Sequence, residues 1–118
     1  MTLTELSKTI TRYRFTFTSE KELQNGIATA LIKEKIPHLR EFVLNVTDRP
    51  DFMLYDGIVI EVKIKGSLAD LLRQATRYAG YDQVTGILVV GTPHWLSRIP
   101  ATLAGKPVRA LRLIGSML

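Results

Sequence analysis

The chain has 118 residues, of which 46% are hydrophobic and none is cysteine; this size suits one domain with one core, and the composition excludes wholesale disorder, disulfide bonds and thiolate metal sites. Its net charge of +5 favours polyanionic partners, chiefly nucleic acid. Because no apolar run is long enough to span a membrane and residues 1–15 lack the apolar core of a signal peptide, we expect a cytoplasmic protein with no membrane partner.

The first 18 residues give the weakest pattern in the chain. Aromatic residues alternate with polar ones between residues 12 and 17, so that Tyr13, Phe15 and Phe17 share one side. Alternation of this kind is typical of a strand with one buried face. We therefore predict an edge strand or an extended N-terminal arm over residues 1–18.

The first helix is predicted over residues 18–36. Ser19, with Glu22 three residues later, has the form of a capping box, in which each residue satisfies the other's backbone amide. Apolar residues then recur at helical spacing, at Leu23, Ile27, Ala30 and Leu31. Pro37 ends the helix, since proline cannot continue it.

The remainder of the chain alternates between strand and helix patterns. We predict strands over residues 38–46, 51–55, 58–64, 86–91 and 108–114, with a second helix over residues 67–82 and a loop of at most one helical turn over residues 92–107. The resulting order is helix, three strands, helix, strand, strand. It predicts an α/β protein with a small mixed sheet and helices packed on it.

The strand over residues 58–64 contains an unusual carboxylate and amine. Because side chains alternate across a strand, the isoleucines and Val62 share one aliphatic face, and Glu61 shares the other with Lys63 and Lys65. A solvated strand face explains such a triplet in most proteins. The turn before the strand helps to decide between a solvated face and a functional site.

That turn decides which residue faces Glu61. A two-residue turn at Asp56 and Gly57 would place Asp51 on the opposite face of the sheet from Glu61. A three-residue loop over residues 55–57, with Gly57 in a left-handed conformation, instead sets Asp51 directly across from Glu61. The same register keeps the apolar residues of the preceding strand on the aliphatic face, whereas a slip would bury Asp51 among isoleucines. We therefore predict the three-residue loop.

Two carboxylates on adjacent strands, with a lysine two residues along, suit a hard cation and a phosphate group. Oxygen ligands of this kind favour Mg²⁺ or Mn²⁺. Lys63 can orient or help deprotonate an attacking water, or neutralise charge that develops at phosphorus.

The sequence Pro50-Asp51, followed by Glu61-Val62-Lys63, resembles the signature of the PD-(D/E)XK nuclease superfamily. The resemblance covers roughly residues 19–91. It implies a restriction-endonuclease-like core, a helix–three-strand meander–helix–strand arrangement, within a single nuclease domain over residues 1–118 that adds a C-terminal strand. Gln74 and Tyr78 are similar to the Gln-x-x-x-Tyr motif of the RecB and phage lambda exonuclease branch.

The resemblance also implies roles for individual residues. Asp51 and Glu61, with the Val62 carbonyl, would hold the metal, and Lys63 would position the nucleophilic water. A glutamate of the first helix often joins such sites, and we choose Glu20 as a metal ligand, acting directly or through water.

Other candidates remain beside these. Glu22 is the alternative to Glu20, although the cap already occupies it. The opening Glu20-Lys-Glu-Leu is also similar to that of archaeal Holliday-junction resolvases. Glu41 is a weaker candidate that a solvated strand face explains equally well.

The residues expected to support the site come from the second helix and from the end of the strand over residues 58–64. Gln74 and Tyr78 would steady the site or the strand beside it. Lys65, Arg73 and Arg77 are candidates for phosphate contacts, although a solvated surface explains them about as well.

The resemblance implies a Mg²⁺- or Mn²⁺-dependent DNA endonuclease that hydrolyses phosphodiester bonds. So small a chain favours recognition of DNA structure, branched or single-stranded, and we expect a homodimer, a phage or mobile-element origin and no small-molecule ligand. An exonuclease of the same superfamily and a nucleic-acid-binding module without catalysis are the alternatives.

Overall fold

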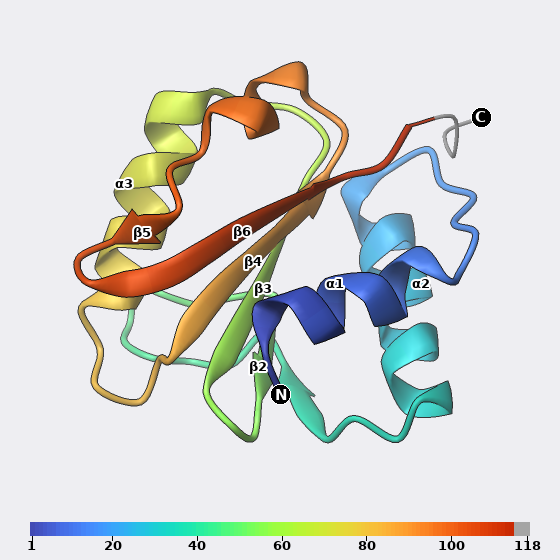
Figure 1. Cartoon of the computed structure of the whole chain (residues 1–118), viewed down its shortest axis with the longest axis horizontal. Coiled ribbons are helices and arrows are strands. Elements are labelled where there is room, and N and C mark those ends of the chain that lie inside the picture. Colours follow the sequence, from blue (N-terminus) through green and yellow to red (C-terminus); the bar gives the residue numbers. More distant parts are fainter. Residues whose placement is uncertain (115–118) are drawn as a thin grey trace.

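The computed structural model describes residues 1–114, which form helices on both faces of a mixed sheet (Figure 1). Its elements in chain order are α1 (Leu3–Thr11), α2 (Glu20–Lys33), β1 (His38–Arg40), β2 (Phe52–Leu54), β3 (Ile58–Lys63), α3 (Leu68–Ala79), β4 (Gly86–Gly91), the 3-10 helix η1 (His94–Arg98), β5 (Thr102–Leu103) and β6 (Lys106–Arg112). The strands lie in the order β1-β2-β3-β4-β6-β5. The predicted α/β class with a mixed sheet is confirmed.

Two apolar clusters hold the layers together. On one face of the sheet, α1 and α2 pack on the aliphatic side of β3, which carries Ile58, Ile60 and Val62. On the other face, α3 and η1 pack against Val59 and the alternate residues of β4. Figure 1 shows α3 on one side of the sheet and α1 with α2 on the other. The side of β3 that carries Glu61 is therefore covered by a helix.

The β2–β3 hairpin has the predicted register. Phe52 pairs with Ile60 in an antiparallel ladder, and the same register sets Asp51 opposite Glu61. Gly57 closes the three-residue loop with a φ of +96°, and its amide donates to the Leu54 carbonyl at 2.9 Å. Glycine suits this position because a side chain is strained at such a φ.

A parallel crossover links β3 through α3 to β4, which is buried along its whole length, as the apolar run between glycines predicted. Gly91 ends β4 beside Lys63, the last residue of β3. A Cβ atom at Gly91 would lie 1.8 Å from the Lys63 carbonyl oxygen. Glycine at this position thus lets β4 approach the backbone that carries Lys63.

The predicted N-terminal strand or arm is wrong for residues 3–11, which form α1. Thr2 and Glu5 make a reciprocal capping box, and Leu6 and Ile10 are fully buried one turn apart. Phe15 and Phe17 are buried in the extended segment that follows, as their alternation required. The cap and the helical spacing are present in the sequence, and the aromatic alternation applies only to the extended residues that follow the helix.

The first predicted strand is also too long. Pairing with β2 ends at Arg40, because Glu41 adopts a φ of +49° that turns the chain out of the sheet. The chain then forms a loop that returns to the sheet at Asp51, where the Glu41 amide donates to the Asp51 carbonyl at 2.9 Å. The region predicted as a loop over residues 92–107 contains η1 and the short strand β5. Among residues 1–114, no helix is long and apolar enough to cross a membrane.

Candidate active site

Asp51 and Glu61 come together where the β2–β3 ladder ends. The Asp51 amide donates to Glu61 Oε1 at 3.3 Å, and the Val62 amide donates to Asp51 Oδ2 at 2.7 Å. The Asp51 carboxylate therefore takes the place of a backbone acceptor from β2, which begins only at the next residue. Because the amide and carbonyl of one strand residue point to the same edge, the Val62 carbonyl lies on the side of Asp51.

Burial raises the pKa of both carboxyl groups. The pKa of Asp51 rises to about 6, chiefly because the group is taken out of water. Burial raises the pKa of Glu61 to about 8, with the charge of Asp51 as the second cause. The Val62 amide and Lys63 oppose the shift at Asp51, and Lys63 opposes the shift at Glu61. A bound cation would stabilise the charged form of both carboxyl groups and lower both pKa values, so a buried pair of this kind is a favourable site for one.

Lys63 and Tyr78 contact opposite oxygens of Glu61. Lys63 Nζ lies 3.6 Å from Glu61 Oε2, and its side chain is 26% exposed. The Tyr78 hydroxyl of α3 donates to Glu61 Oε1 at 3.3 Å from a fully buried ring. Burial, followed by the charge of Glu61, raises the pKa of Tyr78, so its hydroxyl keeps its proton. Glu61 is thus held between a fixed neutral donor and a partly exposed cation.

Gln74 lies one helical turn before Tyr78 and faces the same side of α3. Within residues 1–114, its side-chain oxygen Oε1 is the buried side-chain atom that lacks a hydrogen-bond partner. An unpaired buried acceptor costs free energy that a donor from a ligand or a water would recover. The structure therefore brings Tyr78 to the carboxylate pair, and it places Gln74 on the adjoining wall.

Glu20 and Glu22, which both lie in the first turn of α2, have separate surroundings. Glu22 takes part in the cap, although its carboxylate accepts from the Thr18 amide at 2.6 Å and not in the predicted reciprocal bond with Ser19. Ser19 Oγ accepts from the Glu22 amide at 3.1 Å, as predicted. The charge of Glu20 instead acts on Asp51 and raises its pKa, as does that of Glu41.

The described residues 1–114 hold no group of three or more histidine, aspartate or glutamate side chains that could bind a metal together. The structure therefore pairs Asp51 with Glu61 and leaves Glu20 as a charged neighbour of that pair. Glu41, the weaker candidate, forms an exposed ion pair with Lys21 at 3.7 Å.

A cleft of about 350 Å³ opens beside Lys63 and runs along α3. Its walls include the three basic residues proposed for phosphate contacts, Lys65, Arg73 and Arg77, together with Gln74. Arg73 also pairs with Asp70 one turn earlier on the same helix. The cleft thus gathers four cationic side chains, Lys63 included, next to the carboxylate pair.

A buried ionic cluster beside this cleft was missed by the sequence prediction. Asp48 is only 4% exposed, and its carboxylate accepts from Arg77 Nε and from the Tyr81 hydroxyl, each at 2.8 Å. The hydrogen bond from Arg77 lowers the pKa of Asp48, so this carboxylate stays charged. The sequence predicted Arg77 as a phosphate contact or a solvated residue, and its side chain is indeed half exposed, but its bond to Asp48 was not predicted. This bond ties the loop before β2 to α3.

Comparisons with known protein families, with curated proteins and with solved structures each found no match to this chain. The geometry of the site is therefore the basis for assigning a function. Three features carry that assignment: the opposed carboxylates, the lysine beside them and the basic cleft.

Proposed function

We propose that this chain is a divalent-metal-dependent DNA endonuclease of the PD-(D/E)XK type. The observation that carries the proposal is the antiparallel register that sets Asp51 opposite Glu61, with Lys63 Nζ at 3.6 Å from the Glu61 carboxylate. The register brings all three groups together on one face of the sheet, where the β2–β3 ladder ends. The element order around them also agrees with the core that this superfamily shares.

The donor set fits Mg²⁺ or Mn²⁺. Asp51 and Glu61 would hold the ion with the Val62 carbonyl, all through hard oxygen atoms, and Glu20 would act through a bound water. The raised pKa of each carboxyl group supports this fit, since two buried carboxylates with few partners are a favourable place for a cation. When bound, the ion supplies Lewis acidity at the scissile phosphate.

The other side chains would orient and screen the reacting groups. Lys63 would position the nucleophilic water for in-line attack and offset the charge that develops on phosphorus. Water would add across the P–O3′ bond, leaving a 5′-phosphate and a 3′-hydroxyl. Tyr78 would fix the rotamer of Glu61 through its hydroxyl, and Gln74 would accept a hydrogen bond from the substrate or from an ordered water.

The basic cleft supports a nucleic-acid substrate. Lys65, Arg73 and Arg77 would contact phosphates of the strand that leads to the carboxylates. We propose branched or single-stranded DNA as the substrate and a homodimer as the active form, in which two such sites cut two strands.

A cleavage assay tests the proposal. Linear and circular single strands, a linear duplex, a flap and a four-way junction would be incubated with Mg²⁺, Mn²⁺ or Ca²⁺. Lys63→Ala should lower the rate by about 100-fold, the order found when one charge-stabilising donor is removed. Lys33→Ala, an exposed lysine of α2 on the opposite face, is the matched control and should cut at the wild-type rate.

Two results would contradict the proposal. One is wild-type protein that cuts none of these substrates with any of the ions. The other is Lys63→Ala protein that retains full activity. Cutting of the circular single strand would in addition separate an endonuclease from an exonuclease.

A further inference from the structure

Arg77 is held in place by a buried carboxylate. Asp48 lies in the loop before β2, and its Oδ1 accepts from Arg77 Nε while its Oδ2 accepts from the Tyr81 hydroxyl. An arginine bonded through Nε keeps both terminal amino groups available for other acceptors. The Arg77 side chain is 51% exposed although its anchor is only 5% exposed. The anchoring carboxylate is therefore buried, while half of the Arg77 side chain remains accessible.

Arg77 is one of the residues that line the basic cleft. Lys63 lines the same cleft, so Arg77 shares this space with the lysine next to the carboxylate pair. With Lys65 and Arg73, the cleft has four cationic lining residues against a single anionic one, Asp70. Such an excess of positive charge in a concave site attracts a polyanion.

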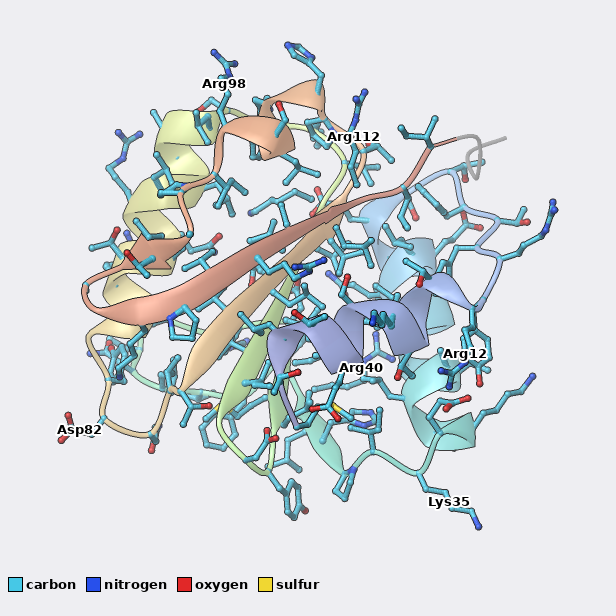
Figure 2. All side chains as sticks on the ribbon, viewed as in Figure 1. Arg12, Lys35, Arg40, Asp82, Arg98 and Arg112 are labelled. Carbon is cyan, nitrogen blue, oxygen red and sulfur yellow. The ribbon has the colours of Figure 1, made fainter. Side chains whose placement is uncertain are left out.

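A second cluster in the chain has the same chemistry but does not line the basic cleft. On the opposite face of the sheet, Glu34 accepts from Arg12 at 2.5 Å and from the hydroxyl of Tyr13. Arg12 lies at the end of α1, away from α3 (Figure 2). The Glu34 side chain is 26% exposed, so this carboxylate is solvated and its arginine is an ordinary surface partner. Burial of the anchor distinguishes Asp48 from Glu34.

We propose that Asp48 is a positioning residue that fixes Arg77, and that Arg77 binds the phosphodiester next to the one held at the carboxylate pair. This inference rests on the proposed function, because it takes a nucleic-acid strand as the ligand of the cleft. Arg77 binds through its terminal amino groups, which match two phosphate oxygens. Asp48 acts only through Arg77.

The test measures binding of a labelled single-stranded oligonucleotide in Ca²⁺, over a series of salt concentrations. Arg77→Gln should weaken binding by about 10-fold and should reduce the slope of log affinity against log salt by about one unit. The matched control Arg12→Gln removes the same charge from the Arg12–Glu34 cluster. It should change the affinity by less than about twofold, since Arg12 lies outside the cleft.

The Asp48→Asn variant distinguishes a role in positioning Arg77 from a simple effect of the protein's net charge. This change makes the protein more positive, so charge alone would tighten DNA binding. Loss of the ionic anchor should instead weaken binding by about threefold, and the same change should have no further effect in an Arg77→Gln background. Arg77→Lys keeps the charge but lacks the planar fork, and it should also bind more weakly than wild type. This variant decides the matter if Asp48→Asn fails to fold, because the Arg77 side chain is half exposed.

Two outcomes would overturn the inference. One is equal affinity and equal salt dependence for Arg77→Gln and Arg12→Gln, and the other is tighter binding by folded Asp48→Asn. If wild-type protein cuts and binds DNA in either case, the inference alone fails and the proposed function stands. If wild-type protein neither binds nor cuts DNA, the proposed function fails and the inference fails with it.

Discussion

The two faces of the sheet differ in what they bury. On the side of α1 and α2, the fully buried side chains are aliphatic or aromatic, as at Leu23, Ile27 and Phe17. On the side of α3, the structure buries both of the charged residues that lie in the interior of residues 1–114, Asp48 and Glu61. Burying a carboxyl group costs free energy unless it is paired; Asp48 is paired with Arg77, whereas the raised pKa of Glu61 marks a cost that the first face does not carry.

We expect that difference to separate a stabilising face from the face that carries the proposed site. The aliphatic face of β3 fixes the register through Ile60 and Val62, and the same register brings Asp51 to Glu61 on the other face. Changes on the two faces should therefore have opposite signatures. Those on the α3 side should affect chemistry more than folding, and those on the α1 and α2 side should affect folding more than chemistry.

The largest effect is expected at the carboxylate pair. Asp51→Asn and Glu61→Gln should each lower the cleavage rate by about 1,000-fold, because each removes a carboxylate that we propose holds the metal and keeps the shape of the side chain. Both variants should remain folded in circular dichroism and thermal melts. Near-normal cleavage by either variant would show that its carboxylate is not needed for the reaction.

The next largest effect concerns folding on the other face. Ile27→Ala should lower the free energy of unfolding by about 3 kcal/mol, because it leaves a cavity beneath α2. The exposed Ile32→Ala on the same helix should change stability by less than about 0.5 kcal/mol. Denaturant unfolding measures both. Cleavage per folded molecule should be unchanged in each. A large loss of that activity in Ile27→Ala would contradict the claim that changes on this face affect folding more than chemistry.

A smaller effect is expected from pH in the absence of metal. The pKa of Glu61 is about 8 in the folded chain against an ordinary 4.5, so the folded chain binds this proton more tightly than the unfolded chain does. The resulting stability is complete below about pH 4.5 and is lost as the pH rises through about 8. The melting temperature should therefore be lower at about pH 8.5 than at about pH 5.5.

Glu61→Gln is the control for this dependence. It should melt at more similar temperatures at the two pH values and should exceed the wild type at the higher one. An equally steep pH dependence in the variant would assign the effect to other groups.

The smallest effect is expected at Tyr78. Tyr78→Phe removes a hydrogen bond of 3.3 Å to Glu61 and keeps the ring that fills the core. We expect about a fivefold fall in kcat with little change in KM, since the hydroxyl contacts Glu61, the proposed metal ligand, and would not touch the DNA. A fall in stability without a change in kcat would make Tyr78 purely structural.

The hairpin is the part of the site that the sequence predicted best. Gly57 allows a two-residue or a three-residue turn, and the aliphatic pattern of the two strands selects between them the register that is observed. Such local signals are sufficient because the two strands are adjacent in the chain. The short helix α1 had local signals as well, in its Thr2–Glu5 cap, but the aromatic alternation that follows obscured them.

The ionic cluster of Asp48 and Arg77 could not be predicted in this way. The two residues are 29 positions apart, and neither belongs to a periodic pattern that would mark it as buried. Burial of Asp48 depends on a left-handed turn at Glu41, which takes the chain out of the sheet and folds the loop back towards α3. Contacts made by an irregular loop with a distant helix follow from the tertiary structure and not from local sequence.

The most direct test of the account is a count of the Mn²⁺ ions that bind to the wild-type protein and to Glu61→Gln. The measurement is best made by calorimetry at about pH 8, where metal binding must displace the proton on Glu61. We expect the wild type to bind Mn²⁺ stoichiometrically, with release of protons, and Glu61→Gln to lose this binding. Equal binding by both proteins, or none by the wild type, would contradict the claim that the buried carboxylates form a metal site.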